Sequence, residues 1–109
     1  MIRKPSTSAM LESTREMSRN SREDAARQLF AWKAVEEAIR GAAGKGFDQV
    51  ELVPPQPLDL RRTEAARALC DKLARLGFQT HWEERIGPRP GEASQVLGIS
   101  WRSAKPDGA

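Results

Sequence analysis

Residues 77–84, GFQTHWEE, directly follow a helix-like segment and contain the only histidine of the chain. Their side chains alternate, with Phe78, Thr80 and Trp82 in one set and Gln79, His81 and Glu83 in the other. Alternation with a period of two is typical of a β-strand whose two faces meet different surroundings. We therefore expect His81 to be an exposed imidazole on the solvated face of a small sheet, pointing away from Trp82.

Two further strands are predicted on either side of this one. Residues 47–53, FDQVELV, place Val50 and Leu52 on one face, and the prolines at 54–57 end the strand because proline cannot donate to a sheet. Residues 95–101, QVLGISW, alternate in the same way. We expect this last strand to form a hairpin with the strand from Phe78, with both apolar faces on the same side.

Helical periodicity predicts two amphipathic helices. The first covers residues 23–43, where Leu29, Trp32, Val35, Ile39 and Ala42 recur at spacings of three and four. The second covers residues 60–76, with an apolar face formed by Ala66, Leu69, Cys70, Leu73 and Leu76. Gly77 is suited to the left-handed position that follows a helix end.

The order of elements predicts an α+β fold with a two-layer α-β-α-β-β arrangement. A strand, a crossover helix and a second strand in one sheet give parallel neighbours, and the last strand returns antiparallel. The expected sheet is therefore three-stranded and mixed, with two helices on one face. We expect a core of Trp32, Leu52, Leu69, Leu73, Trp82 and Ile99. The expected organisation is a polar N-terminal arm at 1–22, extended or helical, a domain at 23–102 and a C-terminal tail at 103–109.

Composition narrows the class of protein. The chain of 109 residues has the length of one domain, with 30% charged residues and a formal net charge of +3. The single cysteine, Cys70, excludes an internal disulfide and favours a protein made in the cytoplasm. No apolar run approaches the roughly 18 residues that a membrane-spanning helix needs. We expect no membrane partner.

The residue types do not predict an enzyme. A metal site needs several converging ligands, yet the chain has one histidine and one cysteine. Cys70 and His81 are expected on opposite sides of the sheet layer, which argues against a nucleophile–base pair. The adjacent pairs Glu36–Glu37 and Glu83–Glu84 diverge rather than converge on a substrate. We expect no catalytic residue, no metal, no cofactor and no small-molecule substrate.

The arm at 1–22 is open to two interpretations. It is rich in Ser, Thr and Arg, and its only large apolar residues after Ile2 are Met10, Leu11 and Met17. A segment with so little apolar surface does not order itself alone, so a disordered tail is one possibility. The other is a docking arm that orders on a partner protein, in which those three residues are the interface anchors.

The arginines support an alternative function. Arg61, Arg62, Arg67 and Arg75 lie in the second predicted helix, and Arg85 and Arg89 lie near the hairpin loop. Such residues can contact the phosphates of a nucleic acid, or they can form an ordinary solvated face. The alternative function is a nucleic-acid-binding or regulatory module, including a phage-encoded inhibitor of a host system.

A family resemblance adds one expectation. The chain has a helix, then GFDQVEL at 46–52, a second helix, LGFQTHW at 76–82 and a strand ending in GISW at 98–101. Over about residues 28–101 this order resembles small accessory proteins of tailed bacteriophages. The resemblance implies a non-enzymatic structural component of a virion, in the capsid, head–tail junction or tail, that docks on other protein subunits of a large assembly. It carries over no functional residue, because the shared motifs are fold positions.

Overall fold

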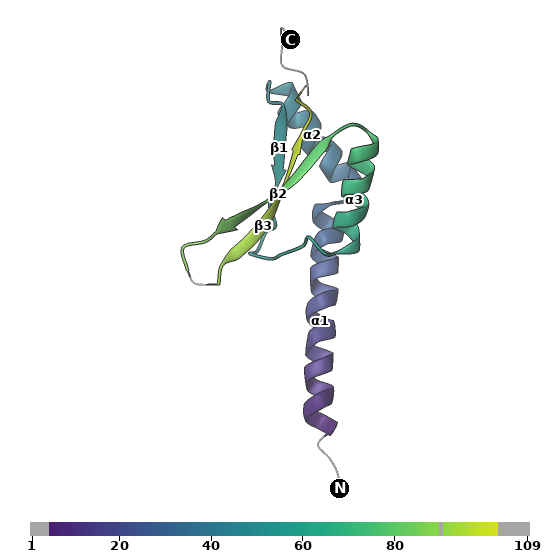
Figure 1. Ribbon diagram of the computed structural model, residues 1–109, viewed down its shortest axis with the longest axis vertical. Helices are drawn as coiled ribbons and strands as arrows, with labels where there is room; N and C mark the ends of the chain where they lie inside the picture. Colours follow the sequence, from purple (N-terminus) through teal and green to yellow (C-terminus); the bar gives the residue numbers. More distant parts are fainter. Residues whose placement is uncertain (1–4, 90, 103–109) are drawn as a thin grey trace.

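The computed structural model describes residues 5–89 and 91–102 (Figure 1). The predicted tail at 103–109 and the first four residues of the predicted arm lie outside this range. The elements are, in order, α1 (Pro5–Leu29), α2 (Trp32–Gly44), β1 (Gln49–Leu52), α3 (Glu64–Arg75), β2 (Gln79–Ile86) and β3 (Ala93–Ser100). This composition of elements confirms the predicted α+β class.

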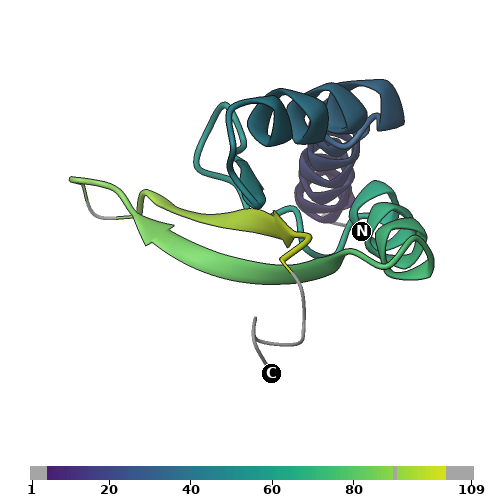
Figure 2. The ribbon, with the colours of Figure 1, turned by 90° about the horizontal axis from the view of Figure 1, so that it is seen from above.

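The sheet has the strand order β1-β3-β2, and both neighbouring pairs are antiparallel. The predicted mixed sheet is therefore wrong: β1 and β2 are not neighbours, because β3 inserts between them. The physical reason lies in β3 itself. Val96, Leu97 and Ile99 have no exposed surface, and a strand that is apolar on both faces is more stable at the centre of a sheet than at its edge. The helices lie on one side of this sheet (Figure 2).

The single helix predicted at 23–43 is also wrong. α1 ends at Leu29 and α2 begins at Trp32, and Ala31 between them is extended, with φ −60° and ψ 134°. The chain turns here because the Phe30 ring is buried against Trp82 of β2, edge to face, with ring centroids 6.2 Å apart. This contact between residues far apart in the sequence outweighs the local preference for a continuous helix.

The predicted arm continues into the domain as part of one helix. α1 begins at Pro5, and its first half extends away from every other element (Figure 1). Every side chain from residue 9 to residue 22 is exposed. Contact with the domain begins near Glu23, and Ala26 has no exposed surface. A helix of 25 residues is about 37 Å long, so most of its length stands clear of the domain.

Helix α3 starts later than predicted because a side-chain cap defines its first turn. Thr63 is extended, and its hydroxyl oxygen accepts a hydrogen bond from the backbone N–H of Ala66 at 3.2 Å. The same hydroxyl donates to the carbonyl oxygen of Leu60 at 2.7 Å. The helix ends as expected, with Gly77 at φ +96°.

The core lies between the helices and the sheet. Four of the six predicted core residues are buried, namely Leu52, Leu69, Leu73 and Ile99. The two predicted tryptophans, Trp32 and Trp82, are half-buried at the margin of the core. The buried set also contains residues that were not in the prediction: Ala26, Phe30, Val35, Leu60, Ala66 and Leu97. Three of these, Ala26, Phe30 and Val35, lie on segments whose course depends on the break between α1 and α2.

Candidate functional site

A hollow of about 440 Å³ lies where α1 passes the start of α3. Five arginines and three carboxylates contribute to its lining, together with Asn20 and Thr63. The charged residues are Arg19, Arg22, Arg27, Arg62, Arg67, Glu23, Asp59 and Glu64. The site therefore combines the second half of the projecting helix with the first turn of α3.

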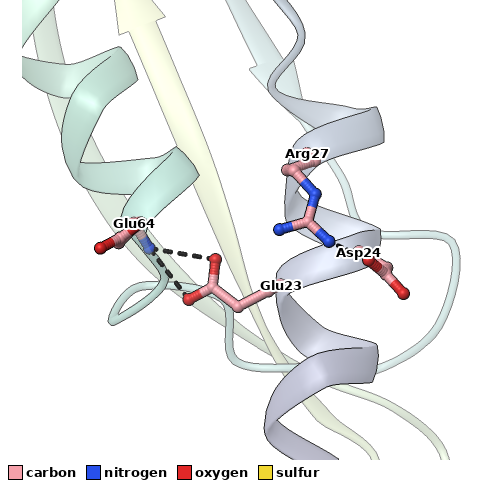
Figure 3. Close-up of polar contacts among 4 residues, drawn as sticks. All are labelled: Glu23, Asp24, Arg27 and Glu64. Carbon is pink, nitrogen blue, oxygen red and sulfur yellow. Dashed lines mark hydrogen bonds and ion pairs between the residues drawn. The ribbon is translucent and has the colours of Figure 1, made fainter.

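Glu23 joins the two sides of this hollow. Its carboxylate oxygens accept hydrogen bonds from the backbone N–H of Glu64, at 3.1 and 3.3 Å (Figure 3). Glu64 is the first residue of α3, and a free N–H at a helix start favours an anionic acceptor. Glu23 therefore caps α3 from a distance of 41 residues along the sequence and holds α1 beside it.

The arginines of the hollow differ in how they are neutralised. Arg27 forms an ion pair with Asp24, one turn earlier on α1 (Figure 3). Among the side chains that the structure describes, Arg19, Arg22, Arg62 and Arg67 form no ion pair. These four exposed guanidinium groups leave an excess of unneutralised positive charge around the hollow.

Two of the six arginines predicted to contact nucleic acid meet at this site. Arg62 and Arg67 line the hollow. The remaining four are separate from it or already paired. Arg75 lies in the last turn of α3, Arg85 pairs with Glu51 and Glu83, Arg89 lies 3.8 Å from Glu92, and Arg61 pairs with Asp59. The basic surface is thus smaller on α3 than the sequence suggested.

Arg61 and Asp59 form a two-point contact at the margin of the hollow. The Nε of Arg61 donates to Oδ1 at 2.9 Å, and its terminal nitrogen donates to Oδ2 at 2.7 Å. The hydrogen bonds from Arg61 hold the pKa of the Asp59 carboxyl below its ordinary value of 3.8, with the nearby charges of Arg61 and Arg62 as smaller contributions. The charge of Arg61 therefore neutralises that of Asp59, and the pair adds no net charge to the hollow.

The arm supplies site residues that the sequence interpretation missed. Arg19 and Arg22 line the hollow, and Arg15 precedes them at helical spacing on the same face of α1. The signal was present in the sequence as arginines at positions i, i+4 and i+7. The sequence alone could not assign these arginines to a site, because only the structure shows that residues 15–22 are helical and continue into the domain.

The three predicted interface anchors divide between two sides of α1. Met10 and Met17, 71% and 65% exposed, are seven residues apart and share one face. Leu11, 51% exposed, lies about 100° around the helix from Met10. Met17 also borders a second hollow, of about 330 Å³, in which Gln56 and Leu58 form the domain side. The methionine face therefore leads to an indentation beside the domain.

His81 and Cys70 occupy different sides of the sheet. His81 is exposed on the face away from the helices, and its ring lies against Gly98 of β3. Cys70 is half-buried against the core, where burial raises the pKa of its thiol above the ordinary value of 9.0. Within residues 5–89 and 91–102, no three His, Cys, Asp or Glu side chains are grouped so that they could hold a metal ion.

Comparisons with known proteins identify no relative of the chain. No protein-family model, no curated protein and no solved structure gives a significant match. Across the described residues, none of the helices combines the length and the apolar character needed to cross a membrane. The function of the chain therefore has to be inferred from its own geometry.

Proposed function

We propose that this protein is a non-catalytic docking protein whose projecting helix α1 binds a partner protein. The observation that carries the proposal is the exposure of the whole helix surface from residue 9 to residue 22. Met10 and Met17 present one apolar face there, and no described residue covers it. A polar helix with this little intramolecular support is marginally stable in water, and a partner groove would stabilise it.

The methionine face is the part of the helix that suits a protein partner. Methionine side chains are flexible and polarisable, so they adapt to an apolar groove of another protein. The hollow bordered by Met17 and Leu58 offers a place for one side chain of the partner at the domain end of the helix. Burying the methionines on binding would offset part of the entropic cost of ordering the helix.

The assembly in which such docking takes place is a narrower proposal. A structural role in a bacteriophage virion rests on the resemblance of the strand and helix motifs over about residues 28–101. The free edges of the sheet support a role in assembly, since β1 and β2 each have one unpaired side that another chain could extend. The docking proposal itself does not require a virion.

Photo-crosslinking in the expressing cell tests the docking face. A photoreactive residue at position 17 is expected to give one dominant protein adduct, identified by mass spectrometry. The same residue at position 16, on another face of α1, should give little of it. The Met10→Gln/Met17→Gln variant should lose the adduct formed from position 18, whereas the matched Glu12→Gln/Glu16→Gln variant should keep it. Equal adducts at positions 16 and 17, or an adduct indifferent to the methionines, would contradict the proposal.

A further inference from the structure

The unneutralised arginines of α1, of the turn before α3 and of α3 itself form one continuous surface. Arg15, Arg19 and Arg22 follow one face of the projecting helix, and Arg62 and Arg67 continue that surface across the hollow. We propose that this arginine surface binds the phosphate backbone of a nucleic acid. The proposal goes beyond docking on a protein, because the partner is of a different class and because Arg15 and Arg19 lie on the side of α1 opposite Met17, with Arg22, alone of the described residues, bordering both hollows.

The arrangement suits a linear polyanion. Arginines at positions 15, 19 and 22 are spread over about 10 Å along the helix axis, at a rise of 1.5 Å per residue. A single bound phosphate cannot reach all of them, whereas consecutive phosphates of one strand can. The guanidinium group donates in a fork that matches two phosphate oxygens, so each arginine can make a specific contact without any base being read.

The acidic residues nearby do not cancel this surface. Glu23 already accepts from the backbone N–H of Glu64, and Asp59 is held by Arg61. Of the three carboxylates of the lining, Glu23 and Glu64 form no ion pair with a described residue, so they reduce but do not balance the charge of the four unpaired arginines. Glu12, seven residues from Arg19, and Glu16, three residues from it, line one margin of the arginine face of α1. They limit contact to one side of the helix and exclude insertion of the whole helix into a groove. The arginines carry the proposed site, because Glu23 already occupies the helix start.

The geometry favours nucleic acid over a lipid surface. A helix that lies on a membrane places its apolar face between flanking basic residues, so that both enter the interface together. Here Arg15 and Arg19 are each two residues from Met17, which places them almost opposite the methionine face. A membrane could engage one face or the other but not both. Contacts to phosphates alone predict binding with little dependence on base sequence.

Fluorescence anisotropy with labelled oligonucleotides tests the proposal on the full chain. The probes are a duplex DNA of mixed sequence, a second duplex of unrelated sequence and a single-stranded RNA. At low salt the unaltered protein should bind at least one of the three polymers, and the two duplexes should not differ. The Arg62→Gln/Arg67→Gln and Arg19→Gln/Arg22→Gln variants should each bind about tenfold or more weakly. The slope of log K against log salt should become shallower by about 0.7–0.9 for each phosphate that the variant no longer neutralises.

The matched control is Arg40→Gln/Arg75→Gln, which removes the same charge from α2 and from the far end of α3. It should change affinity by less than about twofold at the ionic strength of the cell, because distant surface charges are screened. Circular dichroism should show that all variants fold. Equal loss of affinity in the control and the hollow variants, or no binding of the unaltered protein to any of the three probes, would overturn the proposal. Binding to phosphatidylserine vesicles with no binding to the polymers would overturn it in favour of a lipid surface.

Glu23 provides a test in the opposite direction. The Glu23→Gln variant removes a negative charge from the hollow and weakens the cap on α3. If the proposal holds, this variant binds nucleic acid more tightly and melts at a lower temperature. If Glu23 has only a structural role, the variant should lose nucleic-acid affinity as well as melting temperature. The Met10→Gln/Met17→Gln variant should bind nucleic acid normally, so failure of this proposal and failure of the docking proposal are distinguishable.

Discussion

Arg85 and Glu51 join the two outer strands of the sheet across the strand between them. The terminal nitrogen of Arg85 on β2 lies 2.6 Å from a carboxylate oxygen of Glu51 on β1. Arg85 is opposite Ser94 and Glu51 is opposite Gly98, so the path between them passes over Val96 of β3. Val96 alternates with Leu97 of the core and therefore lies on the far face, yet it has no exposed surface. This register predicts that the stem of Arg85 covers Val96 on the face that carries no helix.

A double-mutant cycle separates the charge of this contact from its covering role. The coupling energy between Arg85→Ala and Glu51→Ala should be about 0.2–1 kcal/mol, because both side chains are nearly half-exposed and water screens the pair. Arg85→Met keeps an apolar stem over Val96 and should be more stable than Arg85→Ala. Urea unfolding measures each variant. Identical stability of the methionine and alanine variants would show that Val96 is covered by another group.

The effects of substitutions at Gly98 and His81 on stability should depend strongly on each other. A Cβ added at Gly98 would lie 2.3 Å from the nearest ring carbon of His81, so the imidazole would have to move. We expect Gly98→Ala to lower stability in the presence of His81. In the His81→Ala background the same change should be neutral or stabilising, since glycine inside a strand is less favourable than alanine. Thermal unfolding of the four proteins checks the reversal of sign, and a cost that is the same in both backgrounds would argue against the close approach.

Leu73 and Leu76 form a matched pair at the end of α3. Leu73 has no exposed surface, whereas Leu76 is 55% exposed. Leu73→Ala should lower the free energy of unfolding by about 2–5 kcal/mol, because it removes buried methyl groups and leaves a cavity. Leu76→Ala should cost less than about 1 kcal/mol, as for most surface substitutions. Chemical denaturation measures both, and similar costs for the two variants would contradict the assignment of the buried face.

Acid stability should depend on the contact between Asp59 and Arg61. The pKa of Asp59 is lower in the folded protein than its ordinary value of 3.8, because Arg61 hydrogen-bonds the ionised form. The stabilisation is therefore complete above that value and is lost as the pH falls through the lower folded pKa. In Arg61→Gln, an NMR titration should show the carboxyl pKa of Asp59 closer to 3.8, and the acid-side fall in stability should be shallower. An unchanged Asp59 titration in the variant would contradict the contact.

Local patterns were sufficient for several elements. The alternation from Phe78 placed His81 on the exposed face and Thr80 and Trp82 towards the helices, as the structure confirms. The periodicity of the second helix identified Leu69 and Leu73 as buried, and Gly77 adopts the left-handed conformation expected after it. These features depend on residues within one or two turns of each other, so the sequence carries the whole signal.

Two other features depended on contacts between distant segments. Nothing within residues 28–33 resembles a helix stop, because no glycine or proline occurs there. The break between α1 and α2 arises from the packing of Phe30 on Trp82, more than fifty positions later. The order of strands likewise follows from which strand gains most from burial on both faces, a comparison among all three that no local pattern contains.

The candidate site shows the same division. The sequence by itself determined which arginines occur and their helical spacing on the arm and on α3. The tertiary structure alone decided that Arg19 and Arg22 face Arg62 and Arg67, while Arg61 and Arg85 are balanced by carboxylates. The physical reason is that a helix pattern determines one face of one element. The relative position of two elements comes from long-range packing and from single contacts such as Glu23 with the N–H of Glu64.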